Sequence, residues 1–319
     1  MWRYLGTVVL LATLAGCGGS SVPADGSPHP ASSSPSVASL PPLGPVGMVQ
    51  AADGTVWAAY VKSDAIAALD AQGRPGPPVD VGNAPLRIAE LDGSLWVTSI
   101  RDDNLTEVDP ASGAVGRTLH LDGEPEGVAA YQGHLWVVLQ KAATLVEVDP
   151  ADGKVLHRYD VGGEPRLVVP GTGALYVSDF ARGRVVRVDP GSGKVTRSGA
   201  VCAGVQDLQV HDGALWGACM KDERLVGLDP STLRVVGRVP LEGDPDGLAE
   251  SDGGALLVSL QDGPGLATVD TASGTAQRLF TGKSGRLYDE ANNDVLVVGS
   301  TAYLSDFTGN AVTLVPLAP

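Results

Sequence analysis

The chain has 319 residues, of which 43% are hydrophobic, and it contains 42 glycines and 23 prolines. Its 37 acidic residues outnumber its 22 Lys and Arg residues, which gives a formal net charge of −15. This charge argues against binding to nucleic acid or to an anionic membrane surface and favours an acidic, soluble, exported body.

The first 16 residues have the features of an export signal. Arg3 precedes an apolar run from Leu5 to Leu14, which is too short to span a bilayer but has signal-peptide length. The run ends in Leu14-Ala15-Gly16-Cys17, which resembles the lipobox of bacterial lipoproteins. The resemblance implies cleavage before Cys17, attachment of a diacylglyceryl group to its thiol, and anchoring of an exported protein to the cell membrane or envelope. The alternative is a plain secretory signal with an incidental cysteine.

Residues 17–36 are predicted to form a disordered tether. After Cys17 the segment consists mostly of Gly, Ser, Pro and Ala, which cannot bury enough apolar surface to order the chain. Such a flexible segment would hold the following domain a few nanometres from the lipid.

Residues 37–319 contain seven similar units of about 40 residues each, a length typical of repeat architectures. An aromatic or apolar residue recurs at Trp57, Trp96, Trp136, Tyr176, Trp216, Leu257 and Tyr303. A second marker, an aliphatic residue followed by Asp, recurs after it at Leu69-Asp70, Val108-Asp109, Val148-Asp149, Val188-Asp189, Leu228-Asp229 and Val269-Asp270.

The unit from Gly127 to Pro165 shows the pattern of one repeat. We expect four strands in it, at Gly127–Tyr131, Leu135–Gln140, Thr144–Asp149 and Lys154–Asp160, separated by glycine-containing turns. The strands become more polar from the second to the last, as expected if they run from a buried centre to an exposed rim. Seven such units predict an all-β fold, a seven-bladed β-propeller.

The two ends of the repeat region complement each other. The last unit contains Tyr303–Phe307 and Ala311–Val315 but ends before a fourth strand. The segment Val37–Pro41 occupies the position of a fourth strand ahead of the first unit. We therefore expect this N-terminal strand to complete the last blade and remove an open sheet edge.

The units resemble the YVTN repeat of YncE-like propellers. The resemblance rests on Glu164-Pro165, Asp212-Gly213, Leu215-Trp216 and Val188–Lys194 and covers almost the entire mature chain. It implies the propeller fold but says little about function, because these motifs are turns and core strands.

Cys202 and Cys219 are predicted to form a disulfide. Cys202 lies 14 residues before Trp216, in an inter-blade loop, and Cys219 lies three residues after it, at the end of a second strand. Both thiols therefore reach the same face, and an exported location permits the bond. The alternative is two buried free cysteines. No CxxC pair occurs, so we expect no zinc site, no other metal and no cofactor.

One face of the propeller is expected to bind a ligand. Loops between blades and loops between second and third strands share that face and vary in charge, whereas the opposite turns are short and uniform. A solvated face of mutual ion pairs is the alternative to a site that orients a polar ligand. The candidate ligand-binding residues are Arg87, Arg101, Glu126, Arg166, Asp179, Asp207, Asp246, Arg286 and Asp306.

We expect a non-catalytic binding or scaffold lipoprotein of the cell envelope. It would act as a monomer with an unidentified protein or small polar ligand as partner, and with no nucleic acid. No hydrolase or metalloprotease motif is present, and Gly282-Lys283-Ser284 lacks the upstream glycine of a P-loop, because Gln277 stands there.

The alternative function is a metal-assisted lyase or lactonase that acts at the channel mouth, as in propellers resembling streptogramin lyase or gluconolactonase. Such a lyase uses a histidine base. Here His29 lies in the tether, and none of the other histidines is expected on the site face, since His120 and His157 lie in outer strands and His134 and His211 at hairpin turns. Carboxylates such as Asp207 and Asp246 would remain to hold a divalent cation.

Overall fold

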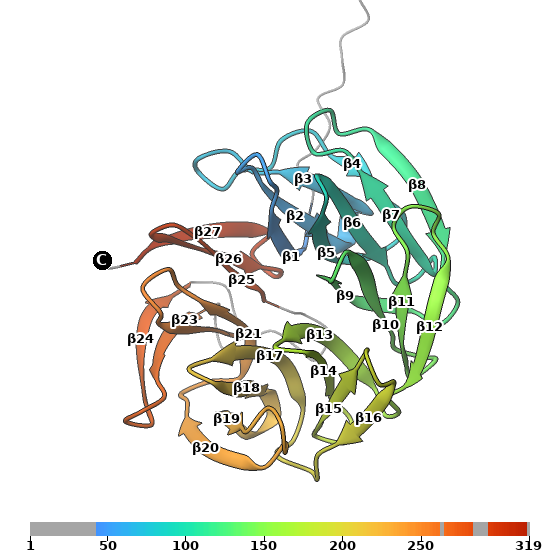
Figure 1. Ribbon diagram of the computed structural model, residues 1–319. Coiled ribbons are helices and arrows are strands. Elements are labelled where there is room, and N and C mark those ends of the chain that lie inside the picture. Colours follow the sequence, from blue (N-terminus) through green and yellow to red (C-terminus); the bar gives the residue numbers. More distant parts are fainter. Residues whose placement is uncertain (1–42, 262–264, 283–292, 318–319) are drawn as a thin grey trace, which may run out of the picture. The chain divides into compact units, whose positions relative to one another are not determined.

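The computed structural model describes residues 43–261, 265–282 and 293–317. Seven small antiparallel sheets form a ring (Figure 1), which belongs to the compact unit Ser39–Pro319. Within the described ranges the helical elements are two short 3-10 turns, η1 (Val61–Ser63) and η2 (Met220–Asp222), and neither could cross a membrane. The predicted all-β, seven-bladed propeller is confirmed.

The strands of each blade follow one another in chain order. Blade one contains β1 (Pro45–Gln50), β2 (Val56–Tyr60), β3 (Ala65–Ala68) and β4 (Val79–Asp80). Blade two contains β5 (Pro85–Leu91), β6 (Ser94–Ser99), β7 (Asn104–Val108) and β8 (Val115–His120). Blade three contains β9 (Pro125–Tyr131), β10 (His134–Leu139), β11 (Thr144–Val148) and β12 (Val155–Asp160). Blades four and five contain β13 (Pro165–Gly171), β14 (Ala174–Asp179), β15 (Arg184–Asp189) and β16 (Lys194–Arg197); and β17 (Val205–His211), β18 (Ala214–Cys219), β19 (Arg224–Leu228) and β20 (Val235–Pro240). Blades six and seven contain β21 (Pro245–Glu250), β22 (Leu256–Leu260), β23 (Gly265–Asp270) and β24 (Thr275–Thr281); and β25 (Val295–Val298), β26 (Thr301–Asp306) and β27 (Ala311–Pro316).

The apolar core lies between the blades. The described buried side chains form seven hydrophobic clusters, one at each boundary between neighbouring sheets. Because side chains alternate along a strand, the second strand of a blade contributes side chains to the clusters on both sides of that blade. Trp136 on β10 packs against Val168 of the next blade, whereas its neighbours Leu135 and Val137 pack against Trp96 of the preceding blade. The recurrent aromatic position is therefore a packing position.

The first strands of the blades form the inner wall of the ring. Each contacts the first strand of the next blade, and β25 contacts β1, which closes the ring. The seventh sheet contains three strands within the described residues, in the order β25-β26-β27. The predicted fourth strand, residues 37–41, lies outside the described residues.

A repeated triplet, Ser-Asp-Phe, marks two blade boundaries. The centroid of the Phe180 ring lies 4.6 Å from the ammonium nitrogen of Lys221 on the following blade, and that of the Phe307 ring lies 4.0 Å from the ammonium nitrogen of Lys62. At both boundaries a glycine leaves room for the ring; a Cβ on Gly44 would lie 3.1 Å from Phe307. The triplet is thus part of a cation–π contact between adjacent blades.

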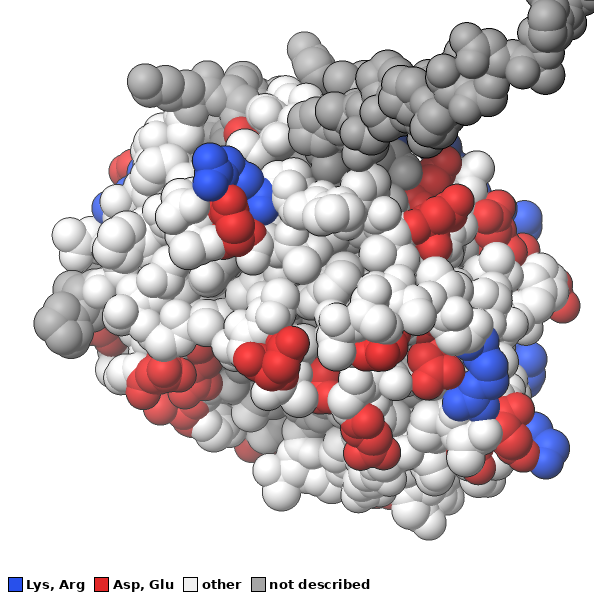
Figure 2. All heavy atoms as spheres, turned by 90° about the horizontal axis from the view of Figure 1, so that it is seen from above, with Lys and Arg blue, Asp and Glu red and all other residues white. Residues whose placement is uncertain are grey.

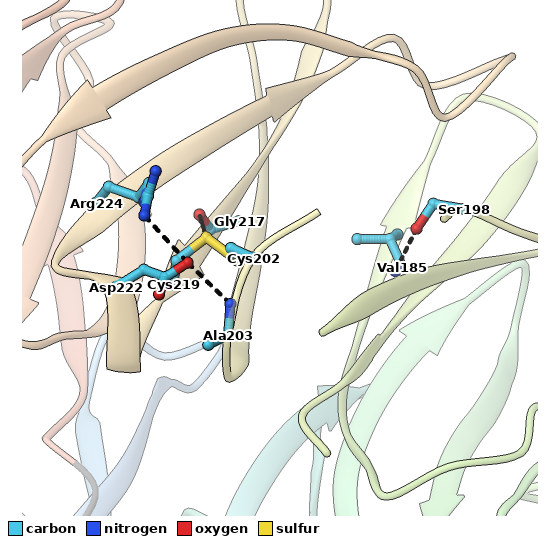
Figure 3. Close-up of a disulfide and its surroundings, with 8 residues drawn as sticks. All are labelled: Val185, Ser198, Cys202, Ala203, Gly217, Cys219, Asp222 and Arg224. Atoms are coloured by element: carbon cyan, nitrogen blue, oxygen red, sulfur yellow. Dashed lines mark hydrogen bonds and ion pairs between the residues drawn. A yellow bond between two sulfur atoms is a disulfide. The ribbon is translucent and has the colours of Figure 1, made fainter. Parts of the chain in front are cut away.

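The predicted disulfide between Cys202 and Cys219 is present, with a Cα–Cα distance of 5.9 Å (Figure 3). It joins the loop before β17 to the end of β18. Beside it, the Asp222 carboxylate accepts a hydrogen bond from the Ala203 N–H at 3.0 Å and pairs with Arg224 at 3.2 Å. The bond is favoured by an oxidising compartment and thus supports export.

Candidate functional site

The first strand of every complete blade contains an irregularity at its start. Regular pairing with the second strand is interrupted after the first residue, so two residues per blade are left out of register. Such bulges change the direction of side chains and often lie beside functional sites. The pairs at this position are Val46-Gly47, Leu86-Arg87, Glu126-Gly127, Arg166-Leu167, Gln206-Asp207 and Asp246-Gly247, and Asn293-Asp294 corresponds to them ahead of β25.

Buried hydroxyl groups fix these residues in three blades. The Thr98 hydroxyl accepts a hydrogen bond from the Arg87 N–H and donates one, at 2.7 Å, to the Glu126 carbonyl of the next blade. Ser178 and Ser259 make equivalent bridges to the carbonyls of Gln206 and Asn293, at 2.9 and 2.8 Å. Each bridge satisfies a buried donor and acceptor and aligns the inner ends of two blades.

Two glycines of the inner wall permit the close approach of neighbouring strands. A Cβ on Gly127 would lie 2.6 Å from the carbonyl oxygen of Arg166, and one on Gly47 would lie 2.3 Å from that of Leu86. Both distances are shorter than van der Waals contact, so larger residues would push the inner strands apart.

Glu126 and Asp246 are equivalent carboxylates with equivalent amide partners. Each is only 1% exposed. Gln140 donates to Glu126 at 2.5 Å, and Gln261 donates to Asp246 at 2.8 Å. Burial raises the pKa of each carboxyl to about 6, although the Arg166 guanidinium, 3.4 Å from Glu126, opposes the shift there.

Asp207 and Asp294 bind the backbone of the following blade. Asp207 accepts a hydrogen bond from the Leu248 N–H at 2.8 Å, and Asp294 accepts one from the Met48 N–H at 3.0 Å. Burial, together with the negative charge of Asp294, raises the pKa of Asp207 to about 7. Burial also raises the pKa of Asp294. Both carboxyls thus hold a proton more strongly than an exposed Asp.

Arg87 provides the positive charge at the ring centre. Its positive charge opposes the rise that burial causes in the pKa of Glu126, Asp207, Asp246 and Asp294, four carboxyls from four different blades. The Nη1 atom of Arg87 and the Oδ1 atom of Asp246 are buried and have no hydrogen-bond partner among the described residues. The Nε atom of Arg166 is also buried without a partner among them, so the centre offers donors from two arginines and an acceptor from one carboxylate.

The structure brings together five of the predicted ligand-binding residues, namely Arg87, Glu126, Arg166, Asp207 and Asp246. The remaining predicted residues within the described ranges, Arg101, Asp179 and Asp306, do not join them. Arg101 is exposed in the loop after β6. Asp179 and Asp306 stabilise turns, accepting hydrogen bonds from the N–H groups of Glu164 and Gly309. Arg286 lies outside the described residues.

Sequence reasoning missed Asp294, which shares the site. The seventh unit, like the fifth, has no Pro ahead of this position, so the residues around Asp294 did not mark it. Counting back from the recurrent aromatic residue identifies it, because Asp294 precedes Tyr303 by the same nine residues that separate Asp207 from Trp216.

His120 lies at the end of the outer strand β8, as expected, and belongs to a small polar cluster. Its Nε2 atom lies 2.9 Å from Asp122, and both lie near Asp103, beside the inter-blade loop. Within the described ranges this is the one group with spacing suited to a metal ion. It lies at the rim, because β8 is an outer strand, and Asp103 already accepts backbone hydrogen bonds from Gly123 and Glu124.

The surface agrees with the acidic composition. In the view of Figure 2, Asp and Glu side chains form larger groups than Lys and Arg side chains do.

Comparison with known proteins identifies the fold alone. The sequence matches no family model and no curated protein. Among solved structures, a catalytically inactive variant of virginiamycin B lyase from Staphylococcus aureus with quinupristin has a TM-score of 0.74 at 15% identity, covering 86% of this chain and 95% of that one. A streptogramin B lyase has a TM-score of 0.72 at 17% identity, covering 88% and 96%. Hydrazine synthase from Kuenenia stuttgartiensis has a TM-score of 0.74 at 16% identity, covering 91% and 99%. At these identities the likeness establishes a seven-bladed β-propeller like that of virginiamycin B lyase.

Proposed function

We propose that the protein is an exported, lipid-anchored propeller that binds a small polar ligand at the centre of its ring. The observation that carries this proposal is the pair of buried, oppositely charged atoms without partners, Nη1 of Arg87 and Oδ1 of Asp246. Leaving polar atoms of charged groups buried without a hydrogen bond is costly. A ligand with both an acceptor and a donor would satisfy the two atoms together.

Small molecules retained by the purified protein provide the test. The full-length protein, purified from its native membrane, is denatured and the released compounds are identified by mass spectrometry. We expect a stoichiometric compound from the wild type and its loss in the double variant Arg87→Met/Asp246→Asn. The exposed Arg101→Met serves as the control and retains the compound. Recovery of the same compounds from all three proteins would contradict the proposal.

The membrane anchor rests on the lipobox-like sequence that ends at Cys17. The tether of residues 17–36 then carries the propeller away from the bilayer, and the repeat motifs support a place among YncE-like propellers. Cys17→Ser moves the protein from the membrane fraction to a soluble or unprocessed form. Unchanged fractionation and unchanged mass would rule the anchor out.

An enzymatic role is the second candidate, and it is favoured by the carboxyl groups whose pKa lies near neutral pH. A carboxyl with a pKa of about 7, as in Asp207, can exchange protons at physiological pH. One lyase of similar fold was solved with quinupristin, which makes quinupristin the compound to test. Incubation with quinupristin, followed by chromatography and mass spectrometry, distinguishes the two roles. We expect intact quinupristin, and a new product that Asp207→Asn abolishes would favour the enzyme.

A further inference from the structure

Most of the carboxylate oxygens at the ring centre already have partners. Both oxygens of Asp207 accept hydrogen bonds from backbone N–H groups, at 2.7 and 2.8 Å, and both oxygens of Asp294 do so at 3.0 Å. Glu126 accepts a hydrogen bond from Gln140 with one oxygen and pairs with Arg166 through the other. These three carboxyls are satisfied within the protein, so the groups that remain for a ligand are Arg87 and Asp246.

The guanidinium of Arg87 has no partner of its own. Its Nη1 atom is buried without a hydrogen bond, and Arg87 forms no ion pair within the described part of the chain. The residue as a whole is partly exposed, so a ligand can reach it from solvent. A guanidinium can hold a carboxylate through two parallel N–H···O bonds. Arg87 is therefore placed to bind the carboxylate of a ligand.

Asp246 lacks the cation that its counterpart Glu126 has. The two acids occupy the same position in blades six and three, and each uses one oxygen for the amide of a glutamine. The second oxygen of Glu126 pairs with Arg166 of the following blade at 3.4 Å. In blade seven Asn293 takes the position of Arg166, and its amide donates to the Leu260 carbonyl instead. The second oxygen of Asp246, Oδ1, is thus left buried without a hydrogen bond.

Arg87 and Asp246 do not satisfy each other. They belong to blades two and six, which are not neighbours in the ring, and no ion pair joins them within the described ranges. The charge of Arg87 nevertheless acts on Asp246, because it opposes the rise that burial causes in the pKa of that carboxyl. The two unmatched groups therefore share one electrostatic environment without direct contact.

This combination of groups favours a ligand that carries both charges. An anion would pair with Arg87 and leave Asp246 unmatched, and a cation would do the reverse. A neutral polar molecule would hydrogen-bond to both groups, but charge-assisted hydrogen bonds are about twice as strong as neutral ones. A zwitterion pairs with both groups and adds no net charge to a site where charges are costly to bury.

We propose that the ligand of the ring centre is an amino acid whose carboxylate binds Arg87 and whose ammonium group binds Asp246. The ammonium group takes at Asp246 the place that Arg166 takes at Glu126. This inference rests on the proposed binding function and names the class of ligand that the proposed function left open.

The test measures binding of glycine, 4-aminobutanoate and 6-aminohexanoate to the full-length protein by calorimetry. The three amino acids differ in the distance between their charges, and each is compared with two singly charged analogues, as 4-aminobutanoate is with butanoate and butylamine. The measurement is made at pH 8, where Asp246 is ionised, because its pKa is about 6. We expect the tightest amino acid to bind about tenfold or more tightly than either of its analogues, because each analogue loses hydrogen bonds between charged groups.

Two variants assign the two charges of the ligand to the two residues. In Arg87→Met the amino acid should bind no more tightly than the analogue without a carboxylate. In Asp246→Asn it should bind no more tightly than the analogue without an ammonium group. Arg101→Met, in the exposed loop after β6, is the control and keeps the wild-type affinity. If a variant does not fold, the comparison of amino acid and analogues on the wild type still decides the question.

Equal affinity of the amino acids and their analogues for the wild type overturns the inference. A compound released from the purified protein that lacks a carboxylate or an ammonium group also overturns it, but the ring centre would then still bind a ligand of another class. Failure of the proposed function gives a different result, in which no compound is retained and none of the probes binds, and this result overturns both.

Discussion

The disulfide in blade five should contribute a measurable share of the stability of the propeller. Cys202 and Cys219 are 17 positions apart. For a loop of this length the chain-entropy model gives about 3 kcal/mol of stabilisation through the unfolded state. In a domain of this size, each kcal/mol corresponds to about 2–4 °C in melting temperature, so loss of the bond should lower Tm by about 6–12 °C.

Two independent perturbations measure this contribution. The first is the double variant Cys202→Ala/Cys219→Ala, and the second is reduction of the wild-type protein. Cys219 is fully buried in a cluster with Tyr176 and Val205, so the variant also loses packing and should melt slightly below the reduced wild type. Melting is followed by calorimetry with and without reductant.

The variant provides the control, because reductant should not change its Tm. Thiol titration of unfolded, unreduced wild type should find neither Cys202 nor Cys219 free. The reasoning is refuted if fully reduced wild-type protein, verified by mass, melts at the same temperature as the oxidised protein.

Three further predictions concern the inner wall of the ring. The pKa of Asp207 is about 7 in the folded protein, against 3.8 for an ordinary Asp, so the protonated carboxyl stabilises the fold fully below about pH 4. This stabilisation is lost as the pH rises to about 7, so Tm measured across this range should fall less steeply in Asp207→Asn than in the wild type. Gly127→Ala should lower the free energy of unfolding by about 2 kcal/mol or more in urea titrations, because its Cβ would meet the Arg166 carbonyl, whereas Gly199→Ala, with no atom nearby, should change it little. Ser259→Ala should lower the free energy of unfolding by about 1–3 kcal/mol, because it removes the hydroxyl that bridges Gly247 and Asn293. Ser259→Thr recreates the arrangement at Thr98 and should retain most of the stability. Equal losses in both variants would contradict the role of the hydroxyl.

The fold was predictable because its signals are local and repeated. Turn residues, alternating strands and one aromatic or apolar position recur in each unit, so an error in one unit is corrected by the others. The unit read in full differs from the structure by no more than two residues at any strand boundary: β9 begins at Pro125 instead of Gly127, and β10 begins at His134 instead of Leu135. Those ends depend on how far the ladder continues into each turn, which propensity alone does not specify.

The sequence by itself also determined the disulfide, because both cysteines belong to one blade and their positions follow from the direction of a single hairpin. The grouping of charges depended on the tertiary structure. Arg87 and Arg101 occur near each other in the chain and on the same predicted face, yet only Arg87 reaches the ring centre, where it acts on carboxyls from four blades. Closure of the ring brings these distant segments together and removes them from water. Because burial and neighbouring charge set a pKa, the properties of Asp207, Asp246 and Asp294 exist only in the closed propeller.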